Sequence, residues 1–419
     1  MKRYVYPSKL EGSIQAPPSK SFMQRVIAAA LLAEGESLIA NPSLCEDSIS
    51  ALSVAEGLGA SIMKNSDVVI IKGGINLKSD LLNCGESGLC IRMFTPIAAL
   101  TGQRVVLTGR GSLTKRPVSR IEEGLMSLGV SIKSNAGLLP IEVSSVLKGG
   151  YAEIDGSLSS QFLTGLLMAL PAAEKDSVIK VKNLTSKKYI DMTIEVLKDF
   201  CIDIENHEYE EFIIKGGQSY KANKIEIEGD WSGAAFMLCA GAIAGDVIIS
   251  GLNLDSSQPD REIITALKQC GADVNIGKDF VRVSKKNLTG FEFDADDCPD
   301  LIPPLAALAL HCKGESIIKG AARLKDKESN RGDALKSEFE KLCGIDRGII
   351  RIDNNRMIIN GSDIAGGEIN SHGDHRIAMA CAIACLNSSG RVAIENAECV
   401  NKSYNSFFNN LAKLGVKIE

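Results

Sequence analysis

The sequence predicts an α/β protein with two domains. A short phrase that closes a helix and opens a strand recurs six times, at steps of 70, 72, 70, 73 and 71 residues, so that the copies account for all 419 residues. A chain of this length is too long for one ordinary hydrophobic core and is expected to divide. Its content of 45% hydrophobic and 24% charged residues is that of a globular protein.

Each copy of the phrase is centred on one small residue. Glycine is favoured just beyond the end of a helix because a positive φ costs it little. The residues that follow alternate between apolar and polar, which is typical of a strand. The period exceeds the roughly 20–50 residues of solenoid repeats, so we expect each copy to be a complete α/β subdomain. The six centres are Gly59, Gly129, Cys201, Gly271, Gly344 and Gly415.

Six subdomains divide into two sets of three. Strand-like residues give way to a helix of small residues at Ile225–Trp231, near the middle of the chain. A second crossing is expected at Pro17-Pro18, because two prolines stiffen the backbone and disfavour a preceding helix. We therefore predict one domain at residues 19–228 and another from residues 1–18 plus 229–419, with the active site in the cleft between them.

The charge and the apolar stretches limit the classes of partner. A net charge of −5 gives no general attraction for nucleic acid or an anionic membrane, so an anionic ligand needs a local basic cluster. Residues Met1–Glu11 contain no apolar segment of the kind found in secretory signals. The longest apolar stretches fall short of the ~18 residues that span a bilayer. A cytoplasmic protein is expected.

The cysteines and histidines show no pattern of a metal site. None of the 12 cysteines forms a CxxC pair, and the four histidines form no HExxH motif. Buried, reduced cysteines in a reducing compartment explain this pattern. Neither a metal nor an organic cofactor is expected.

Eight polar segments stand in apolar or turn-forming surroundings and are the candidates for ligand binding. Several lie at expected helix starts, where free N–H groups and basic side chains favour an anion. Taken one at a time, most of these segments can be explained as helix caps or as charges exposed to solvent. The triplet Asp374-His375-Arg376 is different, because it opens an apolar helix and needs an internal partner or a ligand. The others are Ser19-Lys20-Ser21 with Arg25, Thr114-Lys115-Arg116, Ser159-Ser160-Gln161, Ser186-Lys187-Lys188-Tyr189, Lys325–Arg331, Asp300 and Lys402.

Two of these segments carry expectations about helices. A helix is expected over Ser21–Glu34, with Phe22, Val26 and Ala29 on one buried face. Lys327 and Arg331 are four residues apart, and on a helix they would project on the same side.

Together and in this order, the segments resemble the 5-enolpyruvylshikimate-3-phosphate synthase family of enolpyruvyl transferases. The match covers essentially the whole chain, and the family fold that it implies has two domains, each of three βαβαββ units with helices inside and sheets outside, an inside-out α/β barrel. The matching motifs are PSKS at 18–21 with Arg25, LTGxxSLxxRP at 107–117, SSQF at 159–162, SKKY at 186–189, PD at 299–300, KESNR at 327–331, DHRIAM at 374–379 and NKSY at 401–404.

The resemblance implies two small-molecule substrates and no cofactor. Several convergent Arg and Lys side chains also suit phosphoenolpyruvate, which carries a carboxylate and a phosphate in one small molecule. The residues implied for shikimate 3-phosphate are Lys20, Ser21, Arg25, Ser159, Ser160, Gln161, Ser186, Tyr189, Asp300 and Lys327. Those implied for phosphoenolpyruvate are Lys20, Gly88, Arg116, Gln161, Arg331, Arg376 and Lys402. A monomer is expected.

The resemblance also implies the chemistry. The 5-hydroxyl of the shikimate ester adds to C2 of phosphoenolpyruvate while C3 takes up a proton, and phosphate is then eliminated. By analogy Glu328 protonates and later deprotonates C3, Asp300 orients or deprotonates the hydroxyl, and Lys20 assists the departing phosphate. Two carboxylates in unequal environments can divide acid and base work in this way.

The sequence departs from the family pattern in three places. Glu86 and Leu89 replace the Asn and Thr of an NxGTxxR motif in which Gly88 and Arg92 are retained. These two changes bear on glyphosate sensitivity and phosphoenolpyruvate affinity, and an acid at position 86 is expected to pair with a cation such as Arg116. The remaining departures, near the KESNR motif, are Arg323 and Asn330.

Two other functions stay open at this point. UDP-N-acetylglucosamine enolpyruvyl transferases share the fold and the donor, but they carry a reactive Cys in the loop that here runs from Thr108 to Arg116 without one. A non-catalytic phosphate-binding homologue would fit the changes at Glu86 and Leu89. Such a protein would not need to keep both Asp300 and Glu328.

Overall fold

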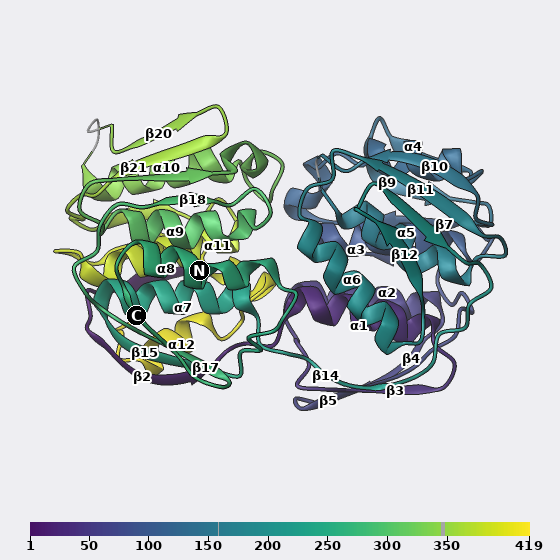
Figure 1. Ribbon diagram of the computed structural model, residues 1–419, viewed down its shortest axis with the longest axis horizontal. Coiled ribbons are helices and arrows are strands. Elements are labelled where there is room, and N and C mark those ends of the chain that lie inside the picture. The colour runs from purple at the N-terminus through teal and green to yellow at the C-terminus, as the bar shows by residue number, and fades with distance from the viewer. Residues whose placement is uncertain (158, 345–347) are drawn as a thin grey trace. The chain divides into compact units, whose positions relative to one another are not determined.

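The computed structural model describes residues 1–157, 159–344 and 348–419 (Figure 1). The chain divides into two compact units: unit 1 comprises Met1–Pro17 and Glu228–Glu419, and unit 2 comprises Pro18–Ile227. Each unit has its own cluster of buried hydrophobic residues. The N-terminal segment therefore belongs to the same unit as the second half of the chain.

The strands of the described residues form six sheets, three in each unit, with one shared pattern. Two neighbouring strands run parallel and the others antiparallel; for example, β6 is parallel to β7, β7 is antiparallel to β9, and β9 is antiparallel to β8. The sheet β1–β23–β22 has three strands and the others four. With the intervening helices, this is the predicted βαβαββ unit, and the α/β fold class is confirmed.

The elements of unit 2 have the following bounds. The strands are β3 (Glu36–Ala40), β4 (Ser61–Lys64), β5 (Val68–Lys72), β6 (Leu81–Asn83), β7 (Val105–Thr108), β8 (Ile132–Asn135), β9 (Leu138–Val143), β10 (Tyr151–Asp155), β11 (Ser177–Lys182), β12 (Ile204–His207), β13 (Glu211–Ile214) and β14 (Lys224–Glu226). The α-helices are α1 (Lys20–Leu32), α2 (Glu46–Leu58), α3 (Gly88–Ala99), α4 (Ser119–Ser127), α5 (Gln161–Ala169) and α6 (Lys187–Asp199).

The elements of unit 1 include the N-terminal strands. The strands are β1 (Lys2–Val5), β2 (Leu10–Gln15), β15 (Gly245–Ser250), β16 (Asp273–Ile276), β17 (Phe280–Ser284), β18 (Glu292–Asp294), β19 (Glu315–Lys319), β20 (Ile350–Asp353), β21 (Arg356–Asn360), β22 (Gly367–Asn370) and β23 (Val392–Glu395). The α-helices are α7 (Trp231–Ala244), α8 (Ile263–Gln269), α9 (Ile302–Ala309), α10 (Arg331–Cys343), α11 (His375–Ala384) and α12 (Phe407–Lys413).

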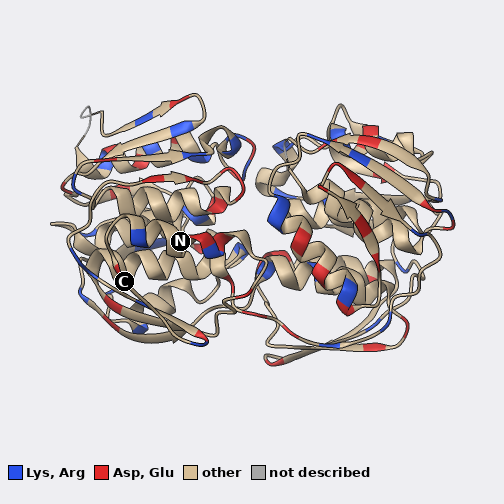
Figure 2. Cartoon of the chain, viewed as in Figure 1, with Lys and Arg blue, Asp and Glu red and all other residues tan. Residues whose placement is uncertain are grey.

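Three helices form the centre of unit 1. Helices α7, α9 and α11 contact one another, and they lie between the strands β20 and β21 on one side and β15 and β17 on the other (Figure 1). Figure 2 shows α7 and α9 almost wholly in tan, because neither helix contains a charged residue. A helix that is apolar all round is expected to be buried on every side.

Helix α1 is also buried on every side. The sequence predicts one buried face, but all ten residues from Phe22 to Leu31 are buried. The single-face prediction is wrong because α1 is enclosed by α2, α3, α6 and β5 rather than lying on a surface.

The backbone at the repeat centres confirms the predicted turn. Each of the six has a positive φ, from 63° at Cys201 to 138° at Gly59. A strand follows five of them, namely β4, β8, β12, β16 and β20, whereas the last leads to a single bridge between Ile418 and Val5. Cys201 is the one exposed cysteine, and all twelve are free thiols.

Candidate functional site

Lys20 is held at the first residue of α1. Ser19 caps the helix by accepting the N–H of Phe22. The Lys20 ammonium lies 3.0 Å from Asp47 Oδ2, and the two side chains are only 15% and 11% exposed. Asp47, on the first turn of α2, was not predicted as part of the site. The ion pair keeps a charged lysine within a largely buried environment.

Arg25 joins three helices of unit 2. Its buried guanidinium donates to the carbonyls of Ser21 and Tyr189, at 2.8 and 3.2 Å, and to the hydroxyls of Thr193 and Thr164, at 2.9 and 3.4 Å. These bonds use four of its five N–H groups. Burial lowers the pKa of Arg25 to about 10, so the side chain stays charged at neutral pH. Arg25 is thus committed mainly to positioning its neighbours.

The three serines implied for a phosphate lie at the starts of neighbouring helices. Ser160 occupies the N-cap position of α5, and Ser159 Oγ accepts the N–H of Gln161 at 3.1 Å. Ser186 occupies the N-cap position of α6 and has a φ of 59°. Helices α5 and α6 contact each other. Hydroxyls at the starts of two helices form a neutral site for an anion, because the helix dipoles favour negative charge there.

Arg92 connects several of the predicted residues. It is 9% exposed and donates to the carbonyls of Gly88 and Pro117, each at 3.1 Å, and to the Gln161 side-chain oxygen at 3.4 Å. It thereby fixes the Gln161 amide and the end of the loop that carries Arg116. Arg92 is not among the site residues predicted from the sequence. A single Arg in the otherwise apolar helix α3 is nevertheless a signal that could have identified it.

Gly88 permits a close approach by two guanidinium groups. A Cβ built on Gly88 would lie 2.4 Å from Arg116 Nη1 and 2.9 Å from Arg92 Nη1. Arg116 Nε is buried and has no hydrogen-bond partner among the described residues. Two guanidinium groups close to one glycine favour an anionic ligand there.

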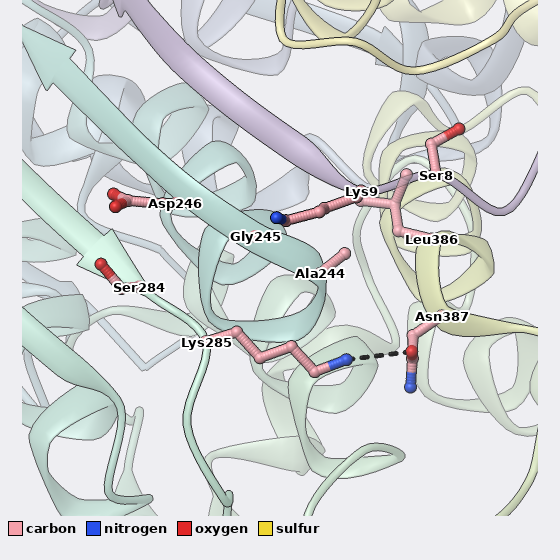
Figure 3. A pocket seen from close by; sticks show the side chains of 9 residues that line it. All are labelled: Ser8, Lys9, Ala244, Gly245, Asp246, Ser284, Lys285, Leu386 and Asn387. Carbon is pink, nitrogen blue, oxygen red and sulfur yellow. Dashed lines mark hydrogen bonds between the residues drawn. The ribbon is translucent and has the colours of Figure 1, made fainter.

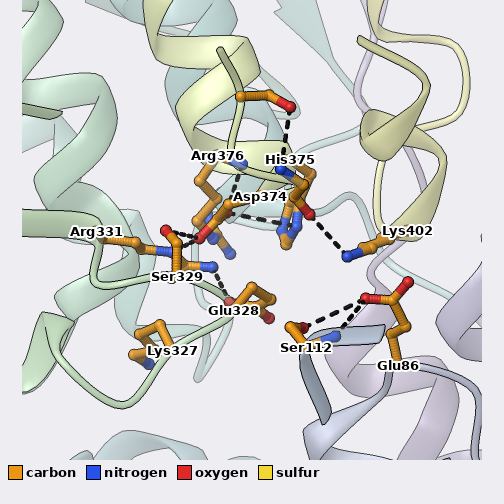
Figure 4. Close-up of polar contacts among 12 residues, drawn as sticks. Glu86, Ser112, Lys327, Glu328, Ser329, Arg331, Asp374, His375, Arg376 and Lys402 are labelled. Atoms are coloured by element: carbon orange, nitrogen blue, oxygen red, sulfur yellow. Dashed lines mark hydrogen bonds and ion pairs between the residues drawn. The ribbon is translucent and has the colours of Figure 1, made fainter. Parts of the chain in front are cut away.

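Glu86 lies against the loop that precedes Arg116. Its Oε2 accepts the backbone N–H and the hydroxyl of Ser112, both at 3.3 Å (Figure 4). A Cβ on Gly111 would lie 2.3 Å from the Glu86 carboxyl carbon. The acid that replaces the family's Asn therefore bonds to the backbone of this loop, a contact that the sequence did not predict.

Arg331 is the centre of a charge cluster in unit 1. Nε lies 2.8 Å from Asp374 Oδ2, and Nη2 donates to the Glu328 carboxylate (Figure 4). Nη1 lies 2.9 Å from Asp300 Oδ1. Ser329 also donates to Asp374, at 3.1 Å. Burial opposes the charge of Arg331, but the three carboxylates outweigh it and raise its pKa further. The arginine holds both proposed catalytic carboxylates in place.

Asp300 is surrounded by cations. It lies on the 3₁₀ helix η4 (Pro299–Leu301), and Arg376 bonds to its Oδ2 at 2.9 Å and to its carbonyl at 3.2 Å. Lys327 Nζ lies 3.6 Å from Oδ1. Burial opposes ionisation, but Arg376, Lys327 and Arg331 together hold the pKa of Asp300 well below its usual range. Asp300 is therefore a carboxylate at neutral pH.

Lys327 is not on a helix, and the predicted helical pairing with Arg331 is wrong. Helix α10 begins at Arg331, because Asn330 caps it by accepting the N–H of Asp333. Lys327 lies in the preceding turn. Burial lowers its pKa to about 8, although Asp300 opposes the shift.

The start of α11 supplies two further groups. Asp374 caps the helix by accepting the N–H of Arg376 at 3.0 Å. Lys402, which is 7% exposed at the end of the 3₁₀ helix η7 (Ala397–Lys402), donates to the carbonyl of Gly373 at 2.8 Å. Arg376 and Lys402 are thus gathered around one helix start, where an anion is favoured.

The predicted residues fall into two sets, one in each unit. Those in unit 2 are Lys20, Ser21, Arg25, Gly88, Arg116, Ser159, Ser160, Gln161, Ser186 and Tyr189. Those in unit 1 are Asp300, Lys327, Glu328, Arg331, Arg376 and Lys402. Each set gathers at helix starts within its own unit, although the members are far apart in sequence.

Other parts of the described chain hold fewer candidates. No group of three or more His, Cys, Asp or Glu among the described residues has the geometry to hold a metal ion. No described helix has the length and apolar character needed to cross a membrane. A separate pocket in unit 1 contains none of the predicted residues; it is lined by Ser8, Lys9, Ala244, Gly245, Asp246, Ser284, Lys285, Leu386 and Asn387 (Figure 3).

Comparison with known families identifies the family of the chain. The family model described as EPSP synthase (3-phosphoshikimate 1-carboxyvinyltransferase) matches residues 5–411. The chain belongs to the EPSP synthase family. The family resemblance predicted from the motifs is thereby confirmed.

Curated EPSP synthases match along their whole length. The chain is 38% identical to 3-phosphoshikimate 1-carboxyvinyltransferase of Clostridium kluyveri over 418 residues, which cover 99% of this chain and 97% of the relative. It is 39% identical to the enzyme of the same name from Clostridium perfringens over 420 residues, with coverage of 99% and 98%.

Solved structures of the family have the same fold. An EPSP synthase from Acinetobacter baumannii superposes with a TM-score of 0.83 at 27% identity, covering 100% of this chain and 99% of that one. The enolpyruvyl transferase NikO from Streptomyces tendae gives a TM-score of 0.79 at 18% identity, with coverage of 100% and 98%. The second match supports the fold alone.

Proposed function

We propose that this protein is a 3-phosphoshikimate 1-carboxyvinyltransferase of the shikimate pathway, and so of aromatic amino acid biosynthesis. It transfers the enolpyruvyl group of phosphoenolpyruvate to the 5-hydroxyl of shikimate 3-phosphate and releases phosphate. The observation that carries the proposal is the Arg331 cluster, in which one buried arginine holds Asp300 and Glu328. Membership of the EPSP synthase family supports the same reaction.

Unit 2 supplies the groups for the phosphate of the shikimate ester. Ser159, Ser160 and Ser186 offer hydroxyls at the starts of α5 and α6, where the positive end of the helix dipole adds to the attraction. Ser21, Gln161 and other polar groups surround the ring. Arg25 contributes by holding Tyr189, since most of its own donors are already used.

Phosphoenolpyruvate is bound by cations from both units. Arg116 beside Gly88, Arg376 and Lys402 at the start of α11, and Arg331 each offer charge-assisted hydrogen bonds to its carboxylate or phosphate. Lys20 and Gln161 complete this set. We propose that residues 19–228 act as one domain and residues 1–18 with 229–419 as the other, and that both contribute to one active site in the cleft between them.

The two carboxylates divide the proton transfers. Asp300, kept ionised by its cations, orients the 5-hydroxyl and accepts its proton as the oxygen bonds to C2 of phosphoenolpyruvate. Glu328 gives a proton to C3, and after phosphate has left with the C2–O bond electrons it takes a proton back from C3. Lys20 stabilises the departing phosphate. A protein that only binds anions does not need both carboxylates.

Phosphate release from the purified protein tests the proposal. Release should require both shikimate 3-phosphate and phosphoenolpyruvate and should stop when either is omitted. Turnover with UDP-N-acetylglucosamine in place of the ester would contradict the assignment. Size-exclusion chromatography and cell fractionation test the accompanying proposals that the protein is a monomer and resides in the cytoplasm.

The use of both units by one substrate is tested separately. Ser186→Ala changes unit 2 and Lys327→Ala changes unit 1. Both should weaken binding of shikimate 3-phosphate, measured by calorimetry. Loss of binding in only one of the two variants would show that the ester is held by one unit alone.

A further inference from the structure

Asp260 is a buried carboxyl group that the proposed mechanism does not use. It lies on the 3₁₀ helix η3 (Pro259–Glu262), which packs against α7. Its side chain is 0% exposed, and Oδ2 accepts the hydroxyl of Ser232 on the first turn of α7. Oδ1 is buried without a hydrogen-bond partner among the described residues. A buried carboxyl with an unsatisfied oxygen is costly to stability, which points to a functional reason for it.

Two of the charged groups that act on Asp260, namely Asp300 and Arg376, are paired with each other in the charge cluster around Arg331. Asp300 and Asp230 oppose its ionisation and Arg376 favours it. Asp230 is itself engaged, because it caps α7 by accepting the N–H of Gly233 at 2.9 Å. Arg376 is shared, because the same guanidinium bonds to Asp300 at 2.9 Å. Helix α7, against which η3 packs, also contacts η4, which carries Asp300, and α11, which carries Arg376. The elements that carry Asp260, Asp300 and Arg376 thus meet at one helix.

We propose that Asp260 is a positioning residue of the transferase reaction, which shares the charge of Arg376 with Asp300 and so sets how strongly Asp300 accepts a proton. The inference rests on the proposed function, because it is measured through the turnover in which Asp300 acts as the base. Asp260 itself contacts no substrate in this scheme. Its proton exchanges with solvent, and no bond other than O–H is made or broken.

The effect follows from the signs of the charges. An ionised Asp260 repels the negative charge of Asp300 and competes with it for the positive charge of Arg376. Both effects make the Asp300 carboxylate more basic. A protonated Asp260 leaves Arg376 to Asp300 alone, which makes Asp300 a weaker base. Turnover should therefore be faster when Asp260 is ionised.

The protonation of Asp260 changes near neutral pH. Burial raises its pKa to about 7, with the charge of Asp300 acting in the same direction. Arg376 and the Ser232 hydroxyl bond act in the opposite direction, and Asp230 adds to the rise. The rising limb of the pH–rate profile should accordingly lie near pH 7.

Asp260→Asn tests the proposal through the pH dependence of kcat. Asn keeps the shape and can accept from Ser232, but it cannot ionise. We expect kcat to fall by about tenfold, as for a loss of roughly one pKa unit of basicity, and the limb near neutral pH to disappear. KM for shikimate 3-phosphate should change little. A neutral limb that persists unchanged in Asp260→Asn overturns the proposal.

Two further variants separate positioning from structural damage. Ser232→Ala removes the hydrogen bond that favours the ionised form of Asp260, so the neutral limb of the pH–rate profile should move to higher pH. A limb that does not move counts against the proposal, even if Asp260→Asn fails to fold. Glu262→Gln alters a partly exposed carboxylate on the same short helix and should leave the profile unchanged. If the wild-type protein releases no phosphate, the proposed function fails; if it does and the variants match it, only the role of Asp260 fails.

Discussion

Arg331 and Asp374 form a buried ion pair in which Nε and Oδ2 are 2.8 Å apart and the side chains are 2% and 0% exposed. The pair joins the start of α10 to the start of α11. Asp374 carries two roles, because it also caps α11 by accepting the N–H of Arg376. The Asp374 carboxylate thus fixes two features. One is Arg331, which holds Asp300 and Glu328, and the other is the start of α11, which carries Arg376.

Asp374→Ala should destabilise unit 1 strongly. Arg331 would keep Asp300 and Glu328 as partners, so we expect a loss near the low end of the roughly 3–5 kcal/mol of unfolding free energy that a broken buried pair typically costs, with the lost α11 cap adding about 1 kcal/mol. Denaturant unfolding measures the change. Asp353→Ala is the matched control, because its pair with Arg356 is 44% and 48% exposed, and exposed pairs contribute about 0–1 kcal/mol. Equal losses in the two variants would contradict the structural role given to Asp374.

Glu328→Gln should abolish turnover while leaving both substrates bound. Gln keeps the shape of Glu, but it cannot give a proton to C3 or take one back. Phosphate release measures turnover, and calorimetry measures binding. Asp326→Asn, an exposed carboxylate in the same turn, is the control and should retain activity. Near-normal turnover in Glu328→Gln would assign the proton to another group, with Lys20 or Lys402 the next candidates.

The fold, and the helix starts that carry the candidate residues, could be predicted from the sequence because they depend on local signals. Glycine or cysteine after each helix marked a positive φ, and all six positions have one. Helix starts with serines and basic residues marked the anion-binding segments. Such features need only neighbouring residues to be recognised, so they can be read without knowing how the chain packs.

The sequence did not reveal groups whose role depends on packing. Asp260 follows Gln-Pro in what resembles an ordinary turn, and only the packing of η3 on α7 buries it. Asp47 became relevant through its ion pair with Lys20, which lies on another helix. The spacing of Lys327 and Arg331 would put them on one side of a helix, but Asn330 caps α10, which begins only at Arg331. Arg92 did leave a local signal, as a single charge in an apolar helix.

Gly88→Ala should weaken phosphoenolpyruvate binding more than shikimate 3-phosphate binding. The new Cβ would lie 2.4 Å from Arg116 Nη1, so the guanidinium must move. The loss of one charge-assisted hydrogen bond, about 1.5–3 kcal/mol, corresponds to a roughly 10- to 150-fold weaker affinity. Calorimetric titration of each substrate supplies the internal comparison. Unchanged affinity for phosphoenolpyruvate would show that Arg116 does not bind it.

The affinity for shikimate 3-phosphate should fall at alkaline pH because of Lys327. Burial lowers the pKa of Lys327 to about 8, so the ammonium, which is the form that attracts the ester, is lost as the pH rises through that value. We expect kcat/KM for the ester to drop by about tenfold for each pH unit above the pKa.

Lys327→Arg keeps a positive charge at high pH and should remove this alkaline limb, even if its longer side chain lowers the overall rate. Lys325→Arg is the matched control, since Lys325 is exposed in the same turn and its replacement should leave the limb in place. A limb that survives in Lys327→Arg would belong to another group. In that case Lys327 would act through its pairing with Asp300, 3.6 Å away, rather than through the substrate.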